Sequence, residues 1–82
     1  MTDTKALRAA IKEAGLTYKT IAKALGIAAY TLQLKIDNDT EFKVSEVDKI
    51  SQMLGFTLEQ KDKIFLQGSG IKIHYLALSN TI

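Results

Sequence analysis

The sequence predicts one small all-α domain followed by a short tail. Its 82 residues suffice for a single core, and 46% of them are hydrophobic while 24% are charged. No proline interrupts the chain, and apolar residues recur at spacings of three and four, as on the buried face of a helix. Glycines follow three of these periodic segments, where helices commonly end. These features predict five helices in residues 1–67 and a tail in residues 68–82.

The first two helices follow from apolar spacing and from capping signals. The spacing i, i+3, i+4 and i+7 predicts a helix over about residues 4–14. Its buried face would consist of Leu7, Ala10, Ile11 and Ala14. Thr17 can cap a second helix that runs to about Leu25. The apolar residues around this cap, Leu16 and Ile21, have the spacing of a hydrophobic staple, which supports a helix start at this point.

A lone glycine separates the second helix from a third. Gly26 is expected to turn the chain, because only glycine enters the left-handed region without a Cβ penalty. The third helix is predicted from Ala28 or Ala29 to about Ile36, and Ala22 is small where the two helices would cross. Their shared core would contain Ile21, Leu25, Ile27, Leu32 and Ile36. The spacing therefore predicts two short helices set at a fixed angle within residues 18–37.

A polar loop and a fourth helix follow. Residues 37–43 lack periodicity, which predicts a loop, with Phe42 and Val44 packed beneath it. Ser45 and Asp48 have the spacing of a capping box, so we expect the fourth helix to begin there and to end before a glycine. Its buried face would contain Val47, Ile50, Ser51 and Leu54.

A short fifth helix completes the predicted domain. Thr57 and Gln60 repeat the capping-box signal. The buried face expected after them contains Leu58, Lys61, Ile64 and Phe65. This helix should end before Gly68, and the core can close by about residue 66.

The tail after "GSG" fits two conformations. In "IKIHYLALSNTI" the residues Ile71, Ile73, Tyr75 and Ala77 alternate as in a strand. A helix would instead align Ile71, Tyr75, Leu78 and Ile82. The β-branched residues and the flanking glycines favour the strand. Since this apolar surface must pack somewhere, we expect it to pair with a second copy of the chain and form a homodimer; packing on its own domain is the alternative.

The inventory of reactive side chains argues against an enzyme. Cysteine is absent and His74 is the only histidine, so the chain offers neither a set of transition-metal ligands nor a convincing nucleophile–base pair. Asp37, Asp39 and Glu41 lack the glycine and the distal glutamate of a calcium loop. We therefore expect no cofactor. Neither a signal peptide nor a membrane-length apolar run is present, which favours the cytoplasm.

Charge is unevenly distributed along the chain. The net charge is only +2, but residues 1–37 carry six bases and three acids, whereas residues 38–82 carry five bases and six acids. The first half is therefore basic by three charges and the second acidic by one. A basic half is usually a solvated surface, and it also suits a polyanionic partner.

Three segments in this order resemble a known family. The sequences "GLTYKTIAKALGI", "YTLQLKI" and "SEVDKISQMLGF" are similar to those of the Cro/repressor (xenobiotic-response-element) family of helix-turn-helix proteins, in particular small phage regulators. The resemblance covers residues 5 to about 66. It implies a five-helix lambda-repressor-like fold and a sequence-specific transcriptional regulator of phage or prophage type. It also implies that the chain binds operator sites in double-stranded DNA as a homodimer.

The resemblance further implies that the third helix enters the major groove. Its candidate base contacts are Ala29, Tyr30, Gln33 and Leu34. Gln33 could pair with adenine, Ala29 and Leu34 could touch a thymine methyl, and Tyr30 could reach a phosphate or a sugar. The candidate phosphate contacts are Thr17, Tyr18, Lys19, Lys35 and Lys43. Each of these residues would also be ordinary on a solvated or packed surface.

Two departures from the family pattern support an alternative. Ala28 stands where family members commonly carry a serine that caps the third helix and touches a phosphate. The loop after that helix carries Asp37, Asp39 and Glu41, whose charges oppose a phosphate backbone. The alternative is an antirepressor, or a protein-interaction module that binds another repressor.

Overall fold

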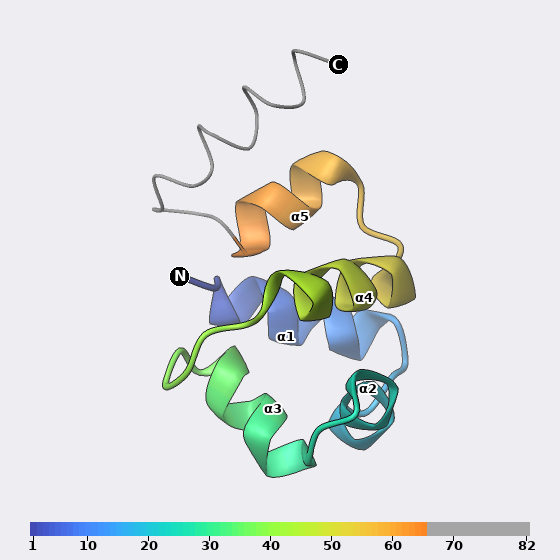
Figure 1. Ribbon diagram of the computed structural model, residues 1–82. Helices are drawn as coiled ribbons and strands as arrows, with labels where there is room; N and C mark the ends of the chain where they lie inside the picture. Colours follow the sequence, from blue (N-terminus) through green and yellow to red (C-terminus); the bar gives the residue numbers. More distant parts are fainter. Residues whose placement is uncertain (66–82) are drawn as a thin grey trace.

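The computed structural model describes residues 1–65 of the chain. These residues form five helices and no strand. The helices are α1 (Thr4–Glu13), α2 (Tyr18–Leu25), α3 (Ala29–Ile36), α4 (Val44–Leu54) and α5 (Leu58–Phe65) (Figure 1). The predicted all-α class is thus confirmed. The predicted tail at 68–82, with its strand and its dimer contact, lies outside the described residues.

Helices α1 and α4 occupy the middle of the domain. In Figure 1, α5 lies on one side of them and the pair α2 and α3 on the other. All five helices contribute to one core, which consists of Leu7, Ile11, Ile21, Ala22, Leu32, Ile36, Val47, Ile50, Ile64 and Phe65. Within residues 1–65, no helix has the length and the apolar character needed to cross a bilayer.

The starts of α1 and α2 each have a side-chain cap, and the cap of α2 is the one expected from the sequence. Asp3 caps α1 by accepting from the Ala6 backbone N–H at 3.1 Å. Thr17 Oγ1 accepts from the Thr20 backbone N–H at 3.1 Å, as expected for the cap of α2. Ala14, expected on the buried face of the first helix, is exposed. The reason is that α1 ends at Glu13, which leaves Ala14 as the capping residue beyond its last turn.

Gly26 makes the turn between α2 and α3. Its φ of +72° lies in the left-handed region, and the Ile27 backbone N–H donates to the Ala22 carbonyl at 3.0 Å, which closes the end of α2. A Cβ atom at Gly26 would meet no other atom within 4 Å. Glycine is therefore required here by backbone conformation and not by close contact between the helices.

Helix α4 begins earlier than the sequence indicates. Its capping residue is Lys43, whose backbone N–H donates to Glu46 Oε1 at 2.8 Å, so the expected box of Ser45 and Asp48 is wrong. Val44 is the first residue of the helix and 79% exposed, so the prediction that it packs beneath the loop is also wrong. Phe42 does pack against the core, edge-on to Phe65 with ring centroids 5.4 Å apart.

Helix α5 has the expected start and a shorter buried face. Thr57 and Gln60 form the predicted reciprocal cap, with hydrogen bonds of 2.8 and 3.1 Å. Leu58, however, is 50% exposed. The buried side chains of α5 all lie in its second half, and they are Asp62, Ile64 and Phe65. The first turn of α5 therefore contributes little to the core.

Candidate nucleic-acid interface

Helices α2 and α3 form one unit, the α2–α3 unit, whose inward faces are apolar and closely packed. Ile21, Leu32 and Ile36 are fully buried, and Ala22 is only 2% exposed. These side chains lie on the faces of α2 and α3 that meet each other and the rest of the core. Because close-packed side chains restrict the angles that two helices can adopt, the opposite faces of α2 and α3 stay close to one arrangement.

The outward face of α3 carries three of the four predicted base contacts. Ala29, Tyr30 and Gln33 are exposed, and Tyr30 is 69% exposed. Leu34 is half-buried, and its carbonyl accepts from the Asp39 backbone N–H at 2.8 Å, where the chain leaves the helix. The face therefore offers one amide, one phenol and small apolar groups.

The start of α3 has no side-chain cap. Ala28 occupies the capping position with extended backbone angles (φ −72°, ψ 151°) and makes no side-chain hydrogen bond, as its methyl group dictates. The backbone N–H groups of the first turn are therefore not satisfied by this side chain. Their partial positive charge lies beside the exposed Ala29 and Tyr30.

Helix α2 presents two lysines beside this face. Lys19 and Lys23 are both exposed and lie one turn apart. Lys23 is absent from the predicted phosphate contacts, although its i+4 spacing from Lys19 was a usable signal. Tyr18 is half-buried against the core, while Thr17 is exposed and its hydroxyl lies 2.9 Å from that of Thr20.

Lys35, predicted to bind a phosphate, is not a free surface cation. Its side chain is 10% exposed, and Nζ donates to Glu46 Oε1 at 2.9 Å and to the Glu41 carbonyl at 3.1 Å. Burial alone would raise the pKa of Glu46. Hydrogen bonds from the Lys43 backbone and from Lys35, together with both positive charges, instead lower that pKa below its ordinary value. Lys35 thus links α3 to α4, and we remove it from the phosphate contacts.

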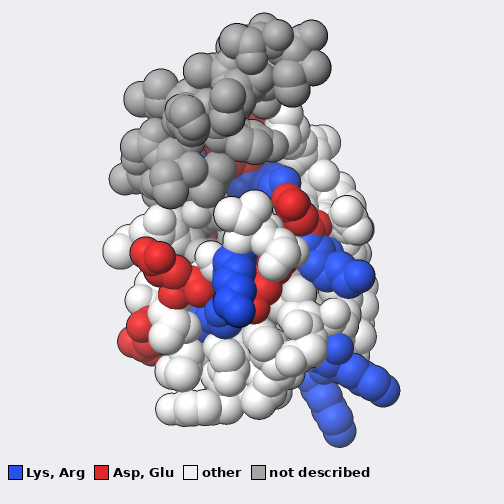
Figure 2. Space-filling view, viewed as in Figure 1, with Lys and Arg blue, Asp and Glu red and all other residues white. Residues whose placement is uncertain are grey.

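Charges separate across the domain surface. Residues 14–36 contain no aspartate or glutamate. Figure 2 shows basic side chains projecting at the lower right, where α2 lies in Figure 1, and an uncharged surface over α3. Acidic side chains gather at the left, beside the loop between α3 and α4. In that loop Asp39 and Glu41 are exposed, and Asp37 forms an ion pair with Arg8. Lys43, the last predicted phosphate contact, is exposed at the start of α4.

Comparisons of the chain with protein-family models, with curated proteins and with solved structures gave no match.

Proposed function

We propose that this protein is a sequence-specific DNA-binding transcriptional regulator of the Cro/repressor type, as found in phages and prophages, with α3 as the helix that enters the major groove. One observation carries the proposal. A short helix, held from behind by α2, presents an uncharged face of small, aromatic and amide side chains inside a stretch without acids, residues 14–36. Such a face fits a groove lined by phosphates and base edges.

The exposed side chains of α3 suit particular base edges. The Gln33 amide both donates and accepts, so it can pair with N7 and N6 of adenine. The Ala29 methyl group can contact the methyl group of thymine, and Leu34 can do so from the edge of the face. The Tyr30 hydroxyl can reach a phosphate or pack on a sugar. A site read in this way would contain A·T pairs opposite α3.

Phosphate contacts would come from the borders of this face. Lys19, Lys23 and Lys43 are exposed cations, and the start of α2 adds Thr17 and backbone N–H groups. Two copies of the chain would place two α3 helices on a two-fold operator, with residues 68–82 as the dimer contact. A regulator of this kind would act in the cytoplasm.

Selection of bound duplexes from a random library tests the proposal. Enriched sequences should share a pseudo-palindromic motif, and fluorescence anisotropy with one enriched duplex should show a steep loss of affinity with salt. If each subunit neutralises about two to three phosphates, a dimer gives a log–log slope of about −4 to −5. Enrichment of no motif at low salt would refute the proposal.

A second candidate function is favoured by the acidic loop. Asp39 and Glu41 are exposed immediately after α3, where they would repel a DNA backbone. An antirepressor would use this loop and α3 to bind the basic DNA-reading surface of another repressor. A pull-down with purified repressors separates the two functions, because an antirepressor binds a repressor in the absence of DNA and selects no duplex.

A further inference from the structure

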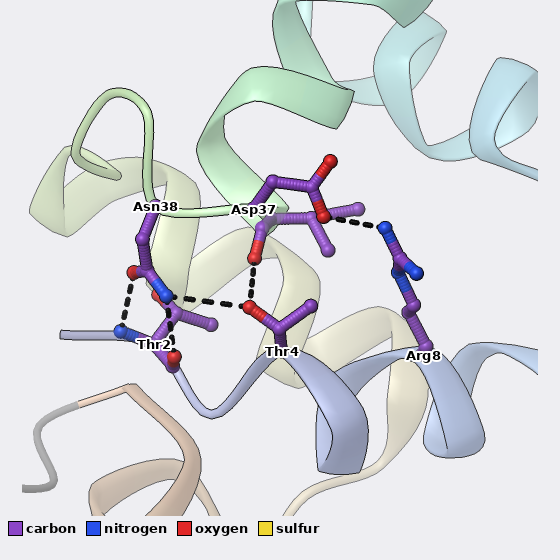
Figure 3. Close-up of polar contacts among 6 residues, drawn as sticks. Thr2, Thr4, Arg8, Asp37 and Asn38 are labelled. Carbon is purple, nitrogen blue, oxygen red and sulfur yellow. Dashed lines mark hydrogen bonds and ion pairs between the residues drawn. The ribbon is translucent and has the colours of Figure 1, made fainter.

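The C-terminal end of α3 is fastened to the start of the chain. Asn38, two residues beyond α3, uses both halves of its amide (Figure 3). Its Oδ1 accepts from the Thr2 backbone N–H at 2.9 Å, and its Nδ2 donates to the Thr2 carbonyl at 2.9 Å and to Thr4 Oγ1 at 3.3 Å. Thr2 is only 9% exposed, which is unusual for a polar residue so near a terminus.

The backbone of Asn38 is shaped for this role. Its φ of +66° makes it the only non-glycine residue with positive φ among residues 1–65. Asparagine tolerates this conformation better than most residues, and here the conformation directs the side chain toward Thr2. An aspartate could not replace it, because a carboxylate cannot donate to the Thr2 carbonyl.

Two further contacts join the same elements. Thr4 Oγ1, at the first residue of α1, donates to the Ile36 carbonyl in the last turn of α3. Arg8, one turn further along α1, forms an ion pair with Asp37 (Figure 3). We use the name N-terminal clasp for Thr2, Thr4 and Asn38, the three residues whose hydrogen bonds hold the end of α3.

We propose that the N-terminal clasp sets the angle at which α3 presents its outward face, and that Asn38 is its main positioning residue. The proposal rests on the DNA-reading role of α3. The side chains proposed to read bases lie along the outward face from Ala29 to Gln33, whereas the clasp holds the chain at and just beyond the C-terminal end of the helix. The clasp thus acts on base readout from a distance, without touching DNA.

Helix geometry shows why a small change at the clasp matters. Gln33 lies three residues, or about 4.5 Å along the axis, from the last residue of α3, so a pivot of about 12° at the C-terminal end moves its backbone by about 1 Å. A displacement of this size takes a bidentate hydrogen bond out of its range of about 2.7 to 3.2 Å. Phosphate contacts made by lysines on α2 tolerate such a shift because the side chains are flexible. These contacts carry no sequence information, so they add the same affinity to every duplex.

The test measures discrimination and not only affinity. Asn38→Gly keeps the left-handed backbone and removes all three side-chain hydrogen bonds. We expect the ratio of affinities for the selected duplex and for a scrambled duplex to fall about tenfold, with the affinity for the scrambled duplex changed less than about twofold. Thr57→Ala, which removes a cap on α5 far from α3, serves as the control and should leave the ratio unchanged. A merely structural role would lower both affinities together, so an unchanged ratio in Asn38→Gly overturns the proposal.

A second readout does not depend on DNA. Residual dipolar couplings of backbone N–H groups report the angle between α1 and α3, and we expect this angle to change in Asn38→Gly. Thr4→Val keeps the side-chain shape and removes both hydrogen bonds of the hydroxyl group, so it should change this angle in the same direction. This variant replaces Asn38→Gly in the test if Asn38→Gly does not fold. An unchanged angle refutes the clasp. If the wild-type protein selects no duplex, the proposed function fails, and the angle still decides whether the clasp positions α3.

Discussion

Replacing Lys35 with methionine tests the claim that this lysine supports α3 and does not bind DNA. Methionine keeps most of the buried stem but removes the charge. Glu46 would then be a carboxylate with an 8% exposed side chain, retaining only the Lys43 backbone N–H as hydrogen-bond donor. The Glu41 carbonyl would also lose its 3.1 Å donor.

The size of the effect follows from this burial. Breaking a buried ion pair by removing one partner costs about 3 to 5 kcal/mol, because the remaining charge is uncompensated. Since Glu46 keeps one backbone donor, we expect the free energy of unfolding to fall by an amount at the lower end of this range, about 3 kcal/mol at pH 7. For a domain of this size, that corresponds to a fall in melting temperature of about 12 to 24 °C.

Acid should affect the stability of the wild type and of Lys35→Met in opposite ways. In the wild type the pKa of Glu46 is lowered, so the carboxylate stabilises the fold above its ordinary pKa of 4.5, and this contribution is lost as pH falls through the lowered value. In Lys35→Met, burial acts without the lysine, so we expect the pKa of Glu46 to rise. Acidification therefore removes the cost of the unpaired carboxylate in the variant, and in the wild type it removes a stabilising contribution.

Urea unfolding at pH 7 and near pH 4 measures both effects. The difference in unfolding free energy between the wild type and Lys35→Met should shrink on acidification. A loss below about 1 kcal/mol at pH 7 would match an exposed pair and contradict the buried one. In a DNA titration, a folded Lys35→Met protein should keep the wild-type salt slope, and a slope reduced by about 1 would return Lys35 to the phosphate contacts.

Four other substitutions test the roles of residues in α2, in α3 and in the turn between them. Gly26→Val should destabilise the domain by at least about 1 to 2 kcal/mol, because its φ of +72° strains any residue with a Cβ; an unchanged thermal midpoint would contradict this account of the turn. Ala28→Ser should raise stability by about 1 kcal/mol by adding the missing cap of α3, as thermal unfolding can measure, and no gain would show that the first turn has other partners. Gln33→Ala should remove about 1 to 3 kcal/mol of discrimination at one base pair and leave the fold intact, whereas Lys19→Ala should weaken binding to all duplexes and flatten the salt slope by about 1. Unfolding of Gln33→Ala would show that this residue does not face outward.

Local signals in the sequence predicted most of the fold. Thr17, Gly26 and the pair Thr57 and Gln60 act on backbone groups within a few residues, so their roles can be read from spacing alone. The helical period likewise separated the buried Leu32 from the outward face of α3.

Contacts between distant segments could not be predicted in this way. Whether Lys35 is buried depends on Glu46, eleven positions away on another helix. The same glutamate also accepts from the Lys43 backbone N–H, so the cap that α4 uses is at Lys43 and not at Ser45. The side-chain hydrogen bonds of Asn38 span 34 to 36 positions, and neither residue type nor spacing indicates them.

The central claim is that the outward face of α3 contacts bases in duplex DNA. Titration of the ¹⁵N-labelled protein with a selected duplex, followed by amide chemical-shift mapping, tests it most directly. We expect the largest changes at Ala29, Tyr30 and Gln33, with smaller ones at Thr17 and at the lysines of α2. Changes confined to α5 or to the acidic loop, or no change at low salt, would contradict the claim.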